Sequence, residues 1–172
     1  ISKNNKLFEL PDLFIKNNLN EQVTLNISPQ KVYFIMVPQQ LLPIYIDDGP
    51  SLFEIKVFDK TFKFTLDEII YPTILSTSLS IVKRGRRIEL NSPVQIQSCI
   101  NSIVIDLYEK GEGEFNQIAT LEPGKLFPLY FNSNKPKECL FIIENEKIKD
   151  KKHHSVLISP FNSEGDSATI IS

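Results

Sequence analysis

The side chains of this chain that are able to carry acid–base or metal chemistry are few and poorly grouped. The only two histidines, His153 and His154, are adjacent within a lysine-rich stretch that begins at Glu144. Neighbouring residues of a strand point to opposite faces, and neighbouring loop histidines without a third ligand hold a metal weakly. We therefore interpret residues 144–154 as an exposed surface loop with no catalytic or metal-binding role.

The two cysteines and one acidic turn are the remaining candidates for chemistry. Cys99 and Cys139 are too few and too far apart for a disulfide framework or a Cys-x-x-Cys zinc site, and we interpret both as small packed residues in a reducing, cytosolic protein. Asp47-Asp48-Gly49 lacks the spaced acidic ligands of a calcium loop and is interpreted as a turn. Since phosphate-binding glycine loops and a Gly-x-Ser-x-Gly motif are also missing, we expect no enzyme activity, no cofactor and no metal.

Four cations surround one glycine at Lys83, Arg84, Arg86 and Arg87. One interpretation is a solvated linker, and the other is a patch for a lipid headgroup or another anion. The net charge of −2 provides no overall positive field for nucleic acid or an anionic membrane. A direct membrane contact would therefore depend on this cluster alone.

The elements that would position these residues are predicted to be strands. Short runs rich in Val, Ile, Phe and Leu alternate with polar residues, and eleven prolines leave little room for helices. Strand signals recur about every 8–12 residues, which is typical of an antiparallel β-sandwich. The predicted strands are Leu13–Lys16, Val23–Ile27, Val32–Val37, Leu42–Ile46, Phe53–Phe58, Phe62–Leu66, Leu75–Val82, Arg87–Leu90, Val94–Gln97, Ile103–Tyr108, Phe115–Leu121, Phe127–Phe131, Leu140–Glu144 and Val156–Ile158.

The two halves of the chain resemble each other. The strongest match sets PQQLLPI, from Pro38 to Ile44, against PGKLFPL, from Pro123 to Leu129. A shared order of strands, turn and double-proline signature predicts two homologous modules, which we place at residues 1–84 and 85–172. The other matched pairs are Phe8–Leu10 with Ile88–Leu90, Leu13–Lys16 with Val94–Gln97, Leu19-Asn20 with Ile100-Asn101, Val23–Ile27 with Ile103–Leu107, and Phe53–Lys56 with Leu140–Ile143.

The residues of the second module resemble a known family. The run IELNSPVQI from Ile88 to Ile96, followed by a strand and by LEPGKLFPL from Leu121 to Leu129, looks like one repeat of an adaptor-binding domain. That domain belongs to the vacuolar protein sorting-associated 13 proteins, the chorein-type bridge-like lipid-transfer proteins. The resemblance covers both modules and is clearest in the second.

The resemblance implies a fold and a partner. It implies a fragment of a longer array of β-sandwich modules that binds Pro-x-Pro motifs of organelle-specific adaptor proteins. It also implies a cytoplasmic protein that is peripheral at organelle membranes and membrane contact sites. Members of the family carry an asparagine that is similar in position to Asn17, whereas the second module has Ser98 at the matching place.

Three hypotheses follow for this all-β chain of two tandem antiparallel β-sandwich modules. The first is a non-enzymatic module that accepts a proline-containing peptide as an added strand. Its candidate partner-binding residues are Asn17, Asn18, Ser98 and Asn101. The second is direct contact with anionic membranes through the basic cluster, and the third is a purely structural spacer.

Overall fold

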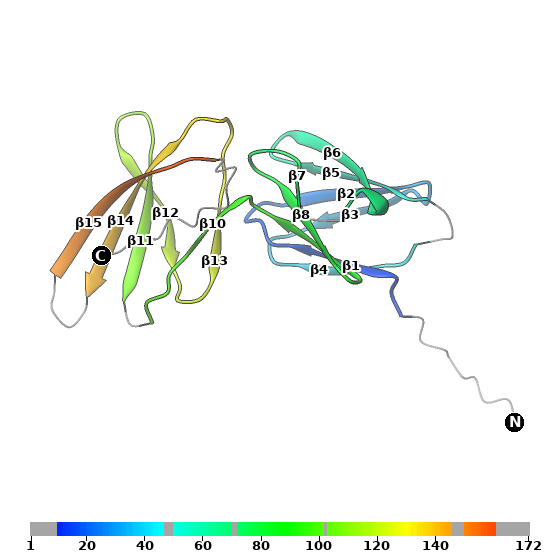
Figure 1. Ribbon diagram of the computed structural model, residues 1–172, viewed down its shortest axis with the longest axis horizontal. Helices are drawn as coiled ribbons and strands as arrows, with labels where there is room; N and C mark the ends of the chain where they lie inside the picture. Colours follow the sequence, from blue (N-terminus) through cyan, green and yellow to red (C-terminus); the bar gives the residue numbers. More distant parts are fainter. Residues whose placement is uncertain (1–9, 47–49, 70–71, 102, 146–149, 161–172) are drawn as a thin grey trace, which may run out of the picture. The chain divides into compact units, whose positions relative to one another are not determined.

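The computed structural model describes residues 10–46, 50–69, 72–101, 103–145 and 150–160. Apart from one short 3-10 helix at Leu66–Glu68, the regular elements of these residues are β-strands in several sheets (Figure 1). The prediction of an all-β chain is confirmed. The Asp47–Gly49 turn and most of the Phe8–Leu10 match lie outside the described residues.

The strands fall into two compact units. Unit 1, residues 1–75 and 80–91, contains β1 (Leu13–Asn17), β2 (Val23–Ser28), β3 (Val32–Met36), β4 (Leu41–Ile44), β5 (Leu52–Val57), β6 (Lys60–Thr65), β7 (Thr73–Ile74), β8 (Ser80–Arg84) and β9 (Arg87–Asn91). Unit 2, residues 76–79 and 92–172, contains β10 (Val94–Gln97), β11 (Val104–Lys110), β12 (Phe115–Leu121), β13 (Leu126–Leu129), β14 (Lys137–Asn145) and β15 (Asp150–Ile158).

The division between the units differs from the one that we placed after Arg84. The observed division in this region falls between Asn91 and Ser92. The reason is that β9 pairs with β8 as a hairpin and also with β1, so its backbone belongs to the sheet of unit 1. The basic cluster is therefore part of a hairpin within unit 1 and not a linker.

Unit 1 contains a five-stranded sheet in the order β4-β1-β9-β8-β7 and a four-stranded sheet in the order β3-β2-β5-β6. All pairs are antiparallel except β1 and β9, which are parallel. Alternate residues of β1, β2 and β5 are buried, as the period-2 pattern predicts. Within this core the rings of Phe53 and Phe64 stack with centroids 5.3 Å apart.

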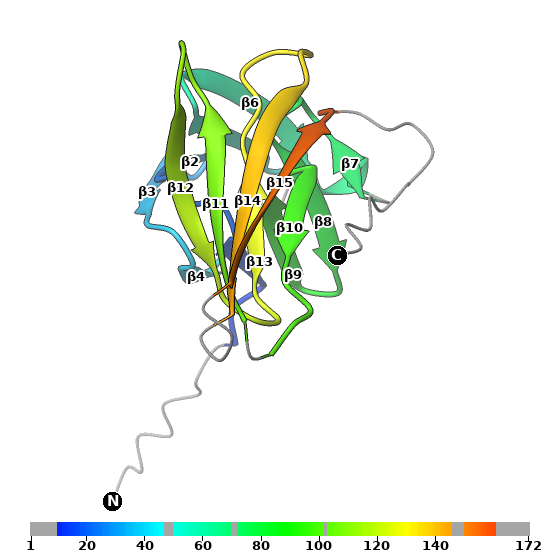
Figure 2. The ribbon, with the colours of Figure 1, turned by 90° about the vertical axis from the view of Figure 1, so that its left-hand side faces the viewer.

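Unit 2 contains a two-stranded sheet of β10 and β13 and a four-stranded sheet in the order β12-β11-β14-β15, which faces the viewer in Figure 2. One buried cluster joins residues of both sheets. Its members are Ile105, Leu107, Leu121, Leu129, Phe131, Cys139 and Phe141. The predicted loop at 144–154 is wrong at both ends, because β14 continues to Asn145 and β15 begins at Asp150. His153 and His154 therefore lie in a strand.

The pairing registers of the first strands agree between the two units. In unit 1, Leu13 lies opposite Ile44 and Ile15 opposite Leu42. In unit 2, the matched residues pair in the same way, with Val94 opposite Leu129 and Ile96 opposite Phe127. The correspondence that we drew from sequence for these strands is therefore also a correspondence of backbone pairing.

After the first strands, the observed strand pairing changes the alignment of the two units that we drew from sequence. Met36 pairs with Val23, whereas Leu121, which corresponds to Met36 by its distance from the double-proline signature, pairs with Ile105. Val23 therefore corresponds to Ile105 and not to Ile103. By the same argument Ile55 corresponds to Phe141, because both pair with the next buried position along β2 and β11.

A matching turn precedes β4 and β13. In unit 1, Pro38 is followed by Gln39 with a φ of 66°, and the N–H of Gln40 donates to the carbonyl of Val37 at 3.2 Å. In unit 2, Pro123 is followed by Gly124 with a φ of 76°. Proline and then a residue with positive φ at the two central positions is the signature of a type II turn, which favours glycine second. Gln39 thus adopts a conformation that costs a residue with a side chain about 1 kcal/mol or more.

Because the second central position of each turn favours glycine, adding glycine there should stabilise the chain and removing it should destabilise the chain. Gln39→Gly should raise the free energy of unfolding by about 0.5–1 kcal/mol, because it relieves the left-handed strain, and Gly124→Ala should lower it by about 1 kcal/mol. Urea unfolding followed by circular dichroism measures both. Gln40→Gly is the control, since the side-chain Oε1 of Gln40 accepts the N–H of Val37 at 3.0 Å and its loss should destabilise. Destabilisation by Gln39→Gly would contradict this account.

Candidate functional site

Asn17 stands at the end of β1 with its side chain fully buried. Its Oδ1 accepts the N–H of Leu19 at 3.0 Å, which closes a local Asx turn. Its Nδ2 donates to the carbonyls of Glu21 at 2.9 Å, Val37 at 3.2 Å and Met36 at 3.4 Å. One amide therefore holds three pieces of backbone together, including the end of β3.

Ser98 occupies the corresponding place in unit 2. The carbonyl of Asn17 accepts the N–H of Gln39 at 2.8 Å, and the carbonyl of Ser98 accepts the N–H of Gly124 at 2.9 Å. The Oγ of Ser98 accepts the N–H of Ile100 at 3.4 Å, as the Oδ1 of Asn17 does for Leu19. Serine therefore keeps the local turn but has no amide with which to hold the neighbouring carbonyls.

Asn18 and Asn101 differ in their surroundings. The Nδ2 of Asn18 donates to Oδ1 of Asn91 on β9 at 2.7 Å, so this side chain joins β1 to its parallel neighbour. Asn101 is exposed. Of the four residues predicted to bind a partner, Asn17 and Ser98 are buried, and neither presents its side chain to a partner in this conformation.

The edge strand β3 exposes large apolar side chains. Tyr33, Ile35 and Val37 are 62%, 52% and 53% exposed, and among the described strands β3 pairs with β2 alone. On β12, the corresponding edge strand of unit 2, Gln117 and Thr120 take the places of Tyr33 and Ile35, and both hydrogen-bond to Asp106. At these two places the edge strand of unit 1 is apolar and that of unit 2 is polar.

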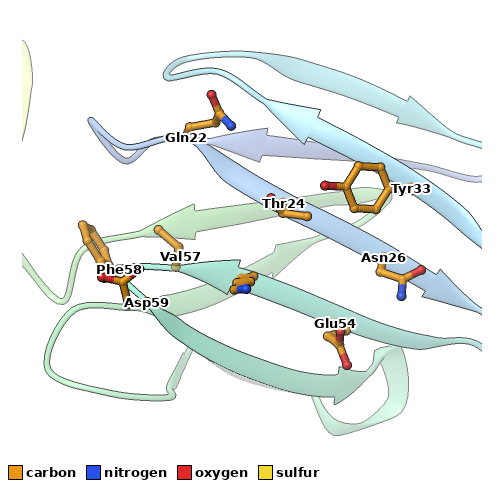
Figure 3. Close-up of a pocket in the computed structure, with 9 residues that line it drawn as sticks. Gln22, Thr24, Asn26, Tyr33, Glu54, Val57, Phe58 and Asp59 are labelled. Atoms are coloured by element: carbon orange, nitrogen blue, oxygen red, sulfur yellow. The ribbon is translucent and has the colours of Figure 1, made fainter.

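A shallow hollow of about 430 Å³ lies next to this edge, on the outer face of the four-stranded sheet (Figure 3). Polar side chains of neighbouring strands line most of it, and the ring of Tyr33 lies beside them. The lining residues are Gln22, Thr24, Asn26, Tyr33, Glu54, Lys56, Val57, Phe58 and Asp59. A strand added beside β3 would place alternate side chains on this face.

Our sequence interpretation did not single out this edge. The signal was present in Val32–Val37, VYFIMV, which is apolar at all six positions. A strand with one solvated face alternates apolar and polar residues, so an unbroken apolar run indicates that both faces are covered. In the described structure the outer face of β3 is exposed instead.

The four cations lie together on the hairpin of β8 and β9, and all four are exposed. Gly85, with a φ of 58°, takes the first place of the two-residue turn, where a positive φ is needed. Arg84 and Arg87 share the carboxylate of Glu89. The Nε of Arg84 lies 3.7 Å from one of its oxygens, and the Nε of Arg87 lies 3.1 Å from the other. That carboxylate offsets part of the positive charge of the hairpin.

The two cysteines have different environments. Cys139 is fully buried, and this burial raises the pKa of its thiol to about 11, while Cys99 is exposed. Among the described residues, no three His, Cys, Asp or Glu side chains are grouped so that they could hold a metal ion. The same part of the chain contains no helix long and apolar enough to cross a membrane.

Comparison of the chain with models of known protein families gives no match, and no curated protein matches it. The resemblance of its repeats to adaptor-binding modules therefore rests on the residues quoted above.

The network of Asn17 predicts a graded loss of stability. Asn17→Ala should lower the free energy of unfolding by about 3 kcal/mol, because buried carbonyls and one N–H lose their partner. Asn17→Ser should cost less, since serine keeps the acceptor for Leu19 as Ser98 does in unit 2. Urea titration of both variants measures this order, and equal losses would contradict a role for the amide group.

The different environments of the two cysteines predict that a thiol reagent modifies only one of them in the folded protein. At about pH 8, a thiol with a pKa near 11 is ionised in roughly one molecule in a thousand, so an alkylating reagent should modify Cys99 and spare Cys139. Intact-mass spectrometry should show one adduct on the folded protein and two after denaturation in guanidinium chloride. Two adducts on the folded protein would show that Cys139 is accessible.

Proposed function

We propose that the chain is a non-enzymatic peptide-binding protein built from two homologous β-sandwich modules. In this proposal it accepts Pro-x-Pro segments of adaptor proteins and so recruits a bridge-like lipid-transfer protein to organelle membranes and membrane contact sites, on their cytoplasmic side. The resemblance of its repeats to adaptor-binding modules supports this class of partner. The observation that carries the proposal is the exposed apolar edge of β3.

The homology of the modules is supported by paired details. The registers of β1 with β4 and of β10 with β13 coincide under one alignment. Under the same alignment the double-proline turns also coincide. So do two backbone hydrogen bonds, from the N–H of Gln39 to the carbonyl of Asn17 and from the N–H of Gly124 to the carbonyl of Ser98. Corresponding hydrogen bonds at corresponding residues favour a duplicated module over two unrelated folds.

A Pro-x-Pro segment is suited to addition at a strand edge. Residues i and i+2 of a strand direct their backbone nitrogens to the same side. Both prolines can therefore face away from β3, where the missing N–H groups cost nothing, while the residue between them bonds to β3. The two rings then lie on one face of the sheet, at the same spacing as Tyr33 and Ile35.

Asn17 acts in this proposal as a positioning residue. Its amide holds the carbonyls of Met36 and Val37, where β3 ends. Unit 2 has Ser98 in place of the amide donor and polar residues along β12. We therefore assign the peptide site to unit 1.

The proposal predicts binding that depends on β3. Isothermal titration calorimetry with peptides carrying one Pro-x-Pro motif should give heats that are lost with Ala-x-Ala peptides. Ile35→Asp should weaken binding about tenfold or more, since it places a charge against an apolar ring, and one factor of ten corresponds to about 1.4 kcal/mol. Thr120→Asp, at the corresponding place in unit 2, is the matched control and should leave the affinity unchanged.

Two results would count against this assignment. Equal weakening by Ile35→Asp and Thr120→Asp would exclude β3 as the specific site. An absence of heat for every peptide in a varied panel would favour the spacer hypothesis for this part of the chain.

A second candidate function is direct contact with anionic membranes, favoured by the four exposed cations of one hairpin. Each could contribute about 1 kcal/mol near an anionic surface. Cosedimentation with phosphatidylserine vesicles tests it, and Lys83→Glu with Arg86→Glu should abolish salt-sensitive binding without breaking the pairs with Glu89. Lys31→Glu with Lys60→Glu, at two exposed positions elsewhere in unit 1, is the control for charge alone. Binding that is equally sensitive to both double variants would exclude a specific role of the hairpin.

A further inference from the structure

The sheet that contains β10 is narrower than the one that contains its counterpart β1. In unit 1, β1 lies between β4 and β9, whereas β10 pairs with β13 alone among the described strands. The difference is visible in burial, since Leu13 and Ile15 of β1 are 4% and 0% exposed. Their counterparts Val94 and Ile96 are only partly buried, although they pack against the core of unit 2.

The backbone of β10 is oriented to receive a strand on its open side. In unit 1, the N–H of Phe14 donates to the carbonyl of Arg86 at 2.7 Å, and that of Asn18 to the carbonyl of Leu90 at 2.9 Å. Gln95 and Cys99 correspond to Phe14 and Asn18 under the shared register. Since backbone groups alternate in direction along a strand, their N–H groups point away from β13.

The outer edge of β13 is protected, in contrast to that of β10. Pro128 lies opposite Gln95, as Pro43 lies opposite Phe14 in unit 1. Proline on an edge strand has no N–H to offer and blocks further pairing. Of the two edges of this small sheet, β10 is therefore the one that remains open to addition in the part of the chain that the structure describes.

The strand that fills the corresponding edge in unit 1 has a recognisable sequence. Ile88 and Leu90 of β9 are 1% and 0% exposed, and Glu89 between them lies opposite Lys16. The same apolar-Glu-apolar pattern occurs at Phe8-Glu9-Leu10, the segment that matches Ile88–Leu90 in the repeat. The structure thus describes one case, β9, in which the first strand of a repeat completes the sheet of the preceding module.

We propose that the open edge of β10 binds the first strand of another copy of this repeat in parallel orientation. The segment that supplies this strand is Leu7–Pro11 of a second chain. The register of β1 with β9 sets Phe8 opposite Ile96, Glu9 opposite Gln97 and Leu10 opposite Ser98. The two apolar side chains then cover the partly buried face of β10. This inference rests on the duplicated module of the proposed function but not on adaptor binding, which involves β3 of unit 1.

Disulfide trapping on the full chain tests the register. In unit 1 the side chains of Asn18 and Asn91 meet at 2.7 Å, and the corresponding pair is Cys99 with position 11 of the donor. The probe is the peptide of residues 5–12 with Pro11→Cys, and the control is the same peptide with Asn5→Cys. Cys139 does not interfere, because it is buried.

The rate at which each peptide forms a disulfide with Cys99 is measured by intact-mass spectrometry in a glutathione redox buffer. The Pro11→Cys peptide should couple to Cys99 about tenfold faster than the Asn5→Cys peptide, because docking raises the local thiol concentration. Equal rates would overturn the docking, and faster coupling of the Asn5→Cys peptide would overturn the parallel direction. Both comparisons use the unmodified chain.

A matched pair of variants tests the edge itself. Gln95→Pro removes one N–H on the open side, whereas Gln95→Ala keeps it, so only the first should reduce coupling to the control rate. Thermal unfolding verifies that both variants fold. Unchanged coupling in a folded Gln95→Pro chain would overturn the assignment to β10. Suppression of coupling by a Pro-x-Pro peptide, with none by its Ala-x-Ala counterpart, would make an adaptor peptide the occupant and overturn the donor that we name.

Discussion

Backbone N–H and C=O groups line both edges of every β-strand, and each edge has to be paired, hydrated or protected. The two units meet this demand in different ways at different strands. Pro43 and Pro128 protect the outer edges of β4 and β13, and lysines at positions 60 and 63 place charge on β6. The edges of β3 and β10 have neither device. The two places where we propose that the molecule gains a partner are therefore edges without a proline or lysine to block addition.

One difference between the units lies in a single buried side chain. Asn17 supplies one acceptor and the two amide hydrogens of Nδ2, so it closes its own turn and also holds the end of β3. Ser98 supplies the acceptor for the turn at Ile100 but has no amide group. The change from asparagine to serine leaves the corner folded and removes the side-chain link between two strands. An edge strand that is held at its end presents its backbone in one conformation, which reduces the ordering cost of adding a peptide.

Sequence alone predicted the strands well where one face is buried, because burial imposes the period-2 pattern that marks a strand. Leu13–Lys16 and Val23–Ile27 were predicted to within one residue of the observed strands for this reason. The parallel pairing of β1 with β9 was not predictable from periodicity, since a strand of either direction carries the same alternation. The hairpin at Lys83–Arg87 was missed because a charge run looks the same in a linker and in a tight turn, although Gly85 is a turn signal. The burial of Asn17 was equally hidden, because an asparagine after a strand is common in exposed turns.

The parallel strand β9 also explains why the sequence repeat and the compact unit do not share a boundary. By sequence, Ile88–Leu90 begins the second repeat, yet its side chains are buried in unit 1. A repeat whose first strand completes the previous module cannot be cut at its own start without exposing the core on one side. In this chain the backbone hydrogen bonds between β1 and β9 therefore tie the start of the second sequence repeat to the sheet of unit 1.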